Sequence, residues 1–144
     1  MSIDVEVLEE SFAYIKPRTT KFSASFYSNL LTDYPQVQAL FKNTDMAAQQ
    51  DKLMKSLVLV IENLRHPDVL TNALRGLGSK HVQYGVMPEH YPLVGGALLK
   101  TFESYLETDW TPRVKQAWTD AYGVITDLML EGANYSDEVL ELKG

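Results

Sequence analysis

The sequence predicts one all-helical domain of about six or seven helices. Three observations support this prediction. Apolar residues recur at intervals of three and four along most of the chain, which places them on single helical faces. Proline and glycine fall between these apolar segments, where they start or end helices. No stretch alternates apolar and polar residues over a length that would form a strand, and 144 residues are enough for one hydrophobic core.

The first two helices are separated by Pro17, and Pro35 ends the second. Their apolar faces are formed by Leu8, Phe12 and Ile15 in the first helix and by Phe22, Phe26 and Leu30 in the second. Tyr27 begins a neighbouring ridge that continues through Leu31 and Tyr34. A short turn then leads to Phe41. These positions predict two helices that bury adjoining faces.

The third and fourth helices follow Asp45 and Pro67. Asp45 ends the loop "KNTD" and is a preferred N-cap residue, whereas proline suits the first position of a helix. Gly85 is a natural end for the fourth helix. The inward residues are Leu53, Leu57, Val60, Ile61 and Leu64 in the third helix and Leu70, Leu74, Leu77, His81 and Tyr84 in the fourth.

The fifth helix is expected to start near Pro88, and the last is expected to have Thr111 as its cap and Pro112 as its first residue. Their inward residues are Leu93, Ala97, Thr101, Phe102, Tyr105 and Leu106, and then Val114, Trp118, Ala121, Tyr122, Ile125, Leu128 and Met129. We expect the domain to span residues 1–131 and residues 132–144 to form a short acidic tail.

Composition excludes several classes of function. The net charge of −6, from 13 basic and 19 acidic residues, argues against nucleic acid or an anionic membrane as a partner. The absence of cysteine excludes disulfides, thiolate metal sites, cysteine nucleophiles and thioether-linked cofactors. The N-terminus lacks an apolar signal core, and no apolar run is long enough to span a bilayer. We therefore expect a cytoplasmic protein.

His81 is the most informative of the three histidines. It extends an apolar stripe, so it is either a core histidine bonded to the backbone or a metal ligand. Three histidines without cysteine do not make a tetrahedral zinc site, but a haem iron needs only one protein ligand on its proximal side. His90 lies in the first turn of a helix and favours a surface position, and His66 fits a turn before Pro67.

Tyr27 and Gln49 are polar residues beside apolar faces. Tyr27 adjoins the ridge of the second helix, and Gln49 continues the stripe of Leu53 and Leu57 backward by one turn. Taken singly, Tyr27 fits ordinary core packing and Gln49 a solvated first turn. Together with His81, they suggest a cavity with an iron ligand on one wall and hydrogen-bond donors on the other.

Four segments resemble the single-domain bacterial globins, and in particular the globin domain of flavohaemoglobins. They are "SFYSNLLTDYPQVQALF" (25–41), "QQDKLMKSL" (49–57), "KHVQYGVMPEHYPLVGGALL" (80–99) and "AWTDAYGVI" (117–125). The resemblance covers roughly residues 5–131. It implies a three-over-three globin fold that encloses a non-covalent haem b.

The resemblance also implies roles for individual residues. His81 matches the proximal iron ligand, and Tyr27 and Gln49 match the distal donors. Gln50 is adjacent, but Gln49 fits better because Leu53 follows it by four residues. The other residues expected to line the haem are Phe41, Leu53, Leu77, Val86 and Tyr91.

The activity that the resemblance implies is reversible binding of oxygen, and of carbon monoxide and nitric oxide, at a histidine-ligated iron. The donors Tyr27 and Gln49 imply slow oxygen release and high oxygen affinity, which fit oxygen binding or storage but fit bulk oxygen delivery poorly. Two alternatives stay open: nitric oxide dioxygenation with a separate reductase, and sensing of gases or redox state. A helical adaptor without haem is the contrasting possibility.

One feature of the flavohaemoglobins is missing from this sequence. Their late glutamate in the last helix would fall near Tyr135, and the nearest carboxylate is Glu131, about one turn earlier. We therefore expect weak peroxidase activity.

Overall fold

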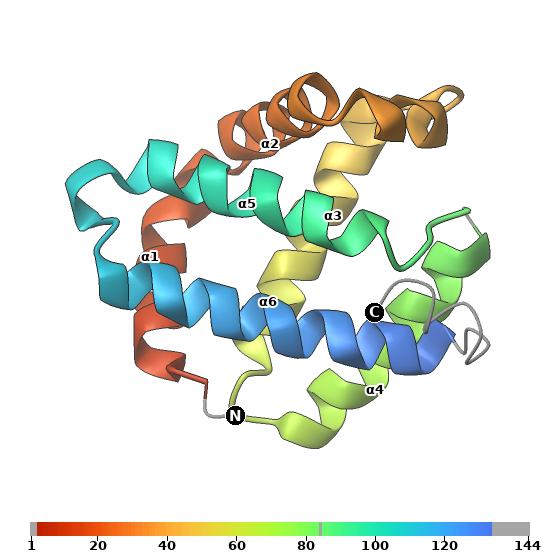
Figure 1. Cartoon of the computed structure of the whole chain (residues 1–144). Helices are drawn as coiled ribbons and strands as arrows, with labels where there is room; N and C mark the ends of the chain where they lie inside the picture. Colours follow the sequence, from red (N-terminus) through yellow and green to blue (C-terminus); the bar gives the residue numbers. More distant parts are fainter. Residues whose placement is uncertain (1–2, 84, 134–144) are drawn as a thin grey trace.

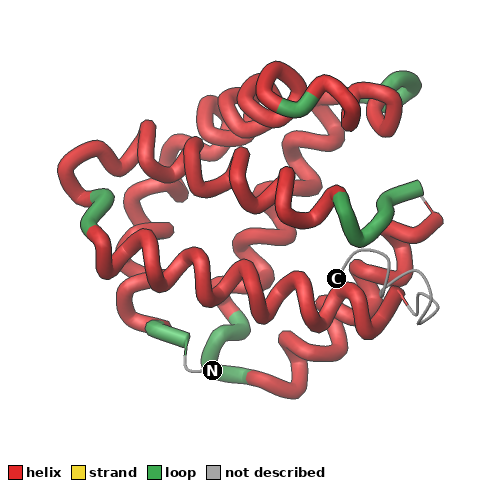
Figure 2. Tube along the Cα trace, viewed as in Figure 1, coloured by secondary structure: helices red, strands yellow, loops and turns green. Residues whose placement is uncertain are grey.

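The computed structural model describes residues 3–83 and 85–133, and within them all regular secondary structure is helical, with no strand (Figure 1). The helices are joined by short loops (Figure 2). The α-helices are α1 (Val5–Ile15), α2 (Thr19–Asp33), α3 (Met46–Glu62), α4 (Pro67–Gln83), α5 (His90–Leu106) and α6 (Pro112–Ala133). Three 3-10 segments, Lys16–Arg18, Pro35–Phe41 and Glu107–Asp109, lie between them. The all-helical prediction is confirmed.

The helix boundaries follow the local chemistry that predicted them. The Asp45 side chain accepts the N–H groups of Ala47 and Ala48 at 3.1 and 3.3 Å, which caps α3. The Thr111 hydroxyl accepts the Val114 N–H at 3.3 Å and caps α6. Gly85, at φ +86°, adopts the left-handed conformation that glycine tolerates best, just after α4.

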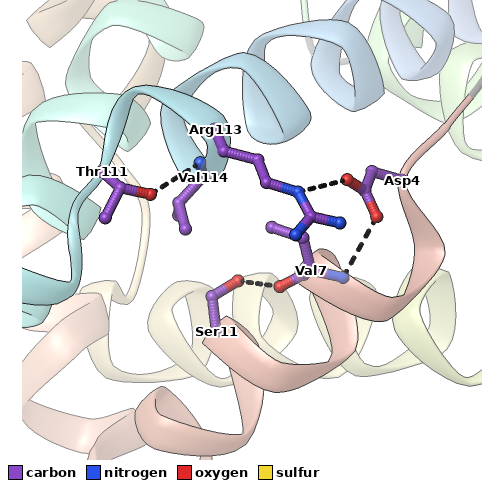
Figure 3. Close-up of polar contacts among 6 residues, drawn as sticks. All are labelled: Asp4, Val7, Ser11, Thr111, Arg113 and Val114. Carbon is purple, nitrogen blue, oxygen red and sulfur yellow. Dashed lines mark hydrogen bonds and ion pairs between the residues drawn. The ribbon is translucent and has the colours of Figure 1, made fainter.

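The start of α1 is tied to the start of α6 by charged and polar contacts (Figure 3). Arg113 Nε donates to Asp4 Oδ2 at 3.1 Å, and Asp4 Oδ1 accepts the Val7 N–H at 3.4 Å. The Ser11 hydroxyl donates to the Val7 carbonyl at 2.7 Å and accepts the Trp118 indole N–H at 2.8 Å. Because the indole is buried, this bond satisfies a donor that would otherwise be costly to bury.

The buried residues form two hydrophobic clusters. The larger cluster joins α1, α2, the middle of α3, α5 and the first half of α6. It contains the stacked rings of Phe102 and Trp118, whose centroids are 4.1 Å apart. The smaller cluster lies where α4 runs beside the C-terminal half of α6, and contains Val60, Leu70, Leu74, Tyr91 and Met129 (Figure 1). Among the described helices, none is both long enough and apolar enough to cross a membrane.

Candidate functional site

Tyr27 and Gln49 meet between α2 and the first turn of α3. The Gln49 amide Nε2 donates to the Tyr27 hydroxyl oxygen at 3.1 Å. The Tyr27 side chain is buried, and its ring meets the Phe41 ring edge to face, with centroids 5.6 Å apart. Because the phenol oxygen accepts from the amide, the phenol proton points away from Gln49 and can be donated to another acceptor.

Burial keeps the Tyr27 phenol protonated. It raises the pKa of Tyr27 above the usual 10.0, and the hydrogen bond from Gln49 opposes this only in part. Tyr27 is therefore a donor at neutral pH. Leu53, one turn after Gln49 on α3, packs against the same hydrophobic cluster as Tyr27 and Phe41. Tyr27, Gln49 and Phe41, each proposed from the sequence, are thus brought together by α2, α3 and the 3-10 segment Pro35–Phe41.

His81 lies half-buried in the last turn of α4. Its Nδ1 is 2.8 Å from the Leu77 carbonyl oxygen, which can only accept, so Nδ1 carries the proton. The lone pair that can coordinate a metal is therefore on Nε2. Burial lowers the pKa of His81 below the usual 6.5, with a weaker opposing effect from the Leu77 bond. The imidazole is thus neutral at neutral pH, the form that binds metals.

Tyr91 is a buried member of the smaller cluster, and Leu77 and Val86 pack against that cluster. The Tyr122 hydroxyl donates to the Tyr91 carbonyl at 2.7 Å, and so fixes the first turn of α5. The Tyr122 ring lies directly over Gly95, where a Cβ would be 2.6 Å from its Cε2 atom. In the sequence, Tyr122 is recognisable only as one residue of the inward face of the last helix. The sequence signal for this contact is Gly95, one turn after Tyr91, because a glycine leaves room for an aromatic ring of another helix.

The residues proposed to line the haem therefore divide between the two clusters. Tyr27, Phe41 and Leu53 belong with the larger cluster, whereas Leu77, Val86 and Tyr91 belong with the smaller. One set carries a buried phenol donor, and the other adjoins a neutral imidazole. A flat apolar group with a metal at its centre fits such a donor set, because it needs apolar walls and one protein nitrogen.

Comparison with known proteins identifies the family. Residues 24–129 match the family model described as Globin. The chain belongs to the globin family. The predicted resemblance and the globin fold are confirmed, and membership implies a haem cofactor for this globin.

A flavohemoprotein of Bacillus subtilis is 27% identical over 128 residues, which cover 88% of this globin but 32% of the relative. This globin thus spans about a third of the length of the curated relatives it matches first. A solved Pseudomonas aeruginosa protein, described as structurally highly homologous to a human hemoglobin, is 26% identical with a TM-score of 0.79. The alignment covers 91% of this globin and 98% of that chain.

A third similar protein comes from Rhodothermus marinus. It is described as an engineered carbene transferase and a candidate nitric oxide dioxygenase, and it has a TM-score of 0.82 at 24% identity. The alignment covers 99% of both chains. At this identity the likeness shows the fold.

The other two histidines of the globin have backbone roles in the structure. His90 Nδ1 accepts the Met87 N–H at 2.9 Å and so holds the loop that precedes α5. His66 is exposed at the junction of α3 and α4, and its carbonyl accepts the Leu70 N–H at 3.1 Å. As predicted, His66 is exposed in the turn before Pro67 and His90 lies in the first turn of α5, but His90 is half-buried rather than exposed, and its bond from Met87 was not predicted.

Glu131 is engaged at the surface. Its Oε1 is 2.8 Å from Arg75 Nη2, and both side chains are about half exposed. Arg75 precedes His81 by six residues, which is about 9 Å along a helix. The carboxylate is thus held beside Arg75 rather than at the His81 ring. Tyr135, the other position considered for a proximal carboxylate, lies outside the described residues.

Replacing Glu131 with glutamine is expected to leave the haem spectrum and the turnover of hydrogen peroxide unchanged. Because the ion pair is half exposed, its loss should cost at most about 1 kcal/mol of unfolding free energy. A dye-coupled peroxidase assay on the wild type and the variant checks this. A large drop in turnover in the variant would show that Glu131 acts on the proximal side.

Acidification is expected to destabilise the haem-free protein through His81. The unfolded chain binds a proton near the ordinary pKa of 6.5, whereas burial lowers the pKa in the folded chain. The free energy of unfolding should therefore fall as the pH drops below about 6.5, and it should level off once the pH is below the pKa of His81 in the folded protein. Urea unfolding at about pH 7.5 and about pH 5.5 would measure this, with His81→Gln as the control. Equal losses in both proteins would contradict the prediction.

Proposed function

We propose that this globin binds haem b non-covalently through His81 and binds oxygen reversibly, with high affinity. The single observation that carries the proposal is the buried Tyr27 phenol, oriented by the Gln49 amide at 3.1 Å. Because the Tyr27 oxygen already accepts from Gln49, the buried phenol can donate its proton to a polar ligand. The absence of cysteine supports non-covalent attachment, because a thioether link is impossible.

His81 would hold the haem in place by donating its Nε2 lone pair to the iron. The bond from Nδ1 to the Leu77 carbonyl orients the ring and increases the basicity of the imidazole. Haem, when bound, supplies ferrous iron that binds diatomic gases and shifts electron density onto oxygen. The preference for oxygen over less polar gases would come from side chains of the protein.

Tyr27 would select oxygen over less polar gases. A donor to a partly negative acceptor contributes about 1.5 to 3 kcal/mol. Since 1.4 kcal/mol is a factor of ten in an equilibrium constant, one such bond tightens oxygen binding by roughly ten- to a hundredfold. Phe41 and Leu53 would keep water from the same space, which protects the bond from competition. Carbon monoxide, which is much less polar, gains little.

Haem titration tests this proposal. We expect the purified haem-free protein to bind one haem per chain and to show a strong absorption band that shifts when carbon monoxide is added to the reduced protein. Failure to bind haem, or a spectrum that carbon monoxide leaves unchanged, would contradict the proposal. The same titration with nitric oxide and oxygen defines the range of gas ligands.

Nitric oxide dioxygenation is the second candidate function. The flavohemoprotein relatives, which are about three times longer, and the Rhodothermus marinus protein favour it. Conversion of nitric oxide and oxygen to nitrate leaves the haem oxidised by one electron, so a separate reductase would have to return that electron. Nitrate formation measured with and without an added flavin reductase separates this function from simple oxygen binding.

A further inference from the structure

Helices α4 and α6 approach each other so closely that both need glycine at the crossing. At Gly78 of α4, the place of a Cβ is occupied by the carbonyl oxygen of Met129, with the Met129 carbonyl carbon and Cα 2.6 and 2.7 Å away. At Gly132 of α6, that place is occupied by the carbonyl oxygen of Arg75, with its Cα 2.5 Å away. These are backbone atoms, so no change of side-chain rotamer relieves the overlap.

Two other glycines on the same helices have no such neighbours. A Cβ at Gly76 of α4 or at Gly123 of α6 would meet nothing within 4 Å. Glycine is less favourable than alanine inside a helix. The close approach of the facing backbone accounts for it at Gly78 and Gly132, whereas nothing in the structure requires it at Gly76 and Gly123. The crossing thus depends on these two positions.

The crossing adjoins the proposed iron ligand. Gly78 precedes His81 by three residues, close to one helical turn, and its neighbour Leu77 supplies the carbonyl that His81 Nδ1 bonds. Met129 is buried in the smaller cluster beside Leu74 and Tyr91. The spacing between α4 and α6 therefore affects the position of the last turns of α4, which carry Leu77 and His81.

We propose that Gly78 and Gly132 are positioning residues that set how far α4 lies from α6, and through it where His81 Nε2 stands relative to the haem. The proposal rests on haem binding by His81. One added methyl group at the crossing forces the helices apart by a distance on the order of 1 Å, because atoms in van der Waals contact do not interpenetrate. His81 moves with the helix that carries it.

Four alanine variants test this proposal. Gly78→Ala and Gly132→Ala introduce the overlap, and Gly76→Ala and Gly123→Ala are matched controls on the same two helices. The measurements are the iron–histidine stretching frequency of the reduced protein, by resonance Raman spectroscopy, and the rate of haem transfer to an excess of apomyoglobin. Circular dichroism shows which variants are folded.

We expect Gly78→Ala to shift the stretching frequency and to speed haem loss by roughly tenfold or more, the size typical of overpacking. Gly132→Ala should act in the same direction but less, because it lies one residue from the end of α6. Both controls should keep the wild-type band and rate.

The proposal is overturned if the folded crossing variants keep the wild-type band and rate, even where their melting temperatures fall, because lower stability alone shows only a structural role. If Gly78→Ala does not fold, Gly132→Ala decides in the same way. A shifted band in a control variant would also overturn it. If the wild type binds no haem or shows no iron–histidine band, the proposed function fails instead.

Discussion

Replacing His81 with glycine is expected to abolish stable haem binding, and imidazole added to the solution is expected to restore it. His81 is neutral and half-buried, with its Nδ1 proton donated to the Leu77 carbonyl at 2.8 Å. Removing the side chain leaves a space of the size of imidazole on the same wall, so the free base can take its place. Absorption spectra of the variant, with and without imidazole, measure both effects.

His90→Ala is the matched control for the loss of a histidine. In the wild type, His90 Nδ1 accepts the Met87 N–H at 2.9 Å. The variant loses this bond in the loop before α5, so its free energy of unfolding should fall by about 1 kcal/mol. Its haem spectrum should stay that of the wild type. If His90→Ala lost the haem and His81→Gly kept it, the assignment of the iron ligand would be wrong.

Tyr27→Phe is expected to speed oxygen release by about ten- to a hundredfold, the effect of losing one hydrogen bond to a partly charged acceptor. The phenol is buried and stays protonated, so the wild type has the donor in place at neutral pH. Carbon monoxide release should hardly change, because that ligand is far less polar. Stopped-flow displacement of oxygen by carbon monoxide gives the rate directly.

Two further variants locate the effect. Tyr105→Phe removes a phenol whose oxygen is 2.9 Å from the Ser25 hydroxyl, in the contact of α2 with α5, and should leave oxygen release unchanged. Gln49→Leu removes the bond that orients Tyr27 and should speed release by less than Tyr27→Phe. Unchanged release in both Tyr27→Phe and Gln49→Leu would show that the distal donors are other residues.

The sequence predicted the helices well because their ends depend on local chemistry. Asp45, Pro67, Gly85 and Pro112 each mark a boundary that the structure places within two residues of the expected position. A cap or a proline acts on its own turn, so its effect does not depend on what the rest of the chain does. The globin family itself followed from longer segments, not from these boundaries.

The site was harder to predict because it depends on contacts between helices. Tyr27 and Gln49 each had an ordinary explanation alone, and only the resemblance to globins gave them related roles. Their hydrogen bond joins two helices, so neither position carries the signal by itself. The same holds for the bond from Tyr122 to the Tyr91 carbonyl.

The glycines of α4 show the limit of sequence patterns. Gly76 and Gly78 lie two residues apart in one helix, and the sequence gives no reason to assign them different roles. The structure gives them different roles, since Met129 of α6 lies against Gly78 while the space around Gly76 is open. No periodicity distinguishes the two, because the difference is set by the approach of another helix.

Reversible oxygenation is the most direct test of oxygen binding by this globin. The reduced, haem-loaded protein is exposed to oxygen, the oxygen is then removed under vacuum, and the absorption spectrum is followed throughout. We expect the spectrum to change on exposure and to return fully to that of the reduced protein, over repeated cycles, because the proposed Tyr27 donor, oriented by Gln49, would stabilise the oxygen ligand. Immediate one-way oxidation to the ferric form, with no oxygenated spectrum that can be reversed, would contradict the proposal that this globin binds oxygen reversibly.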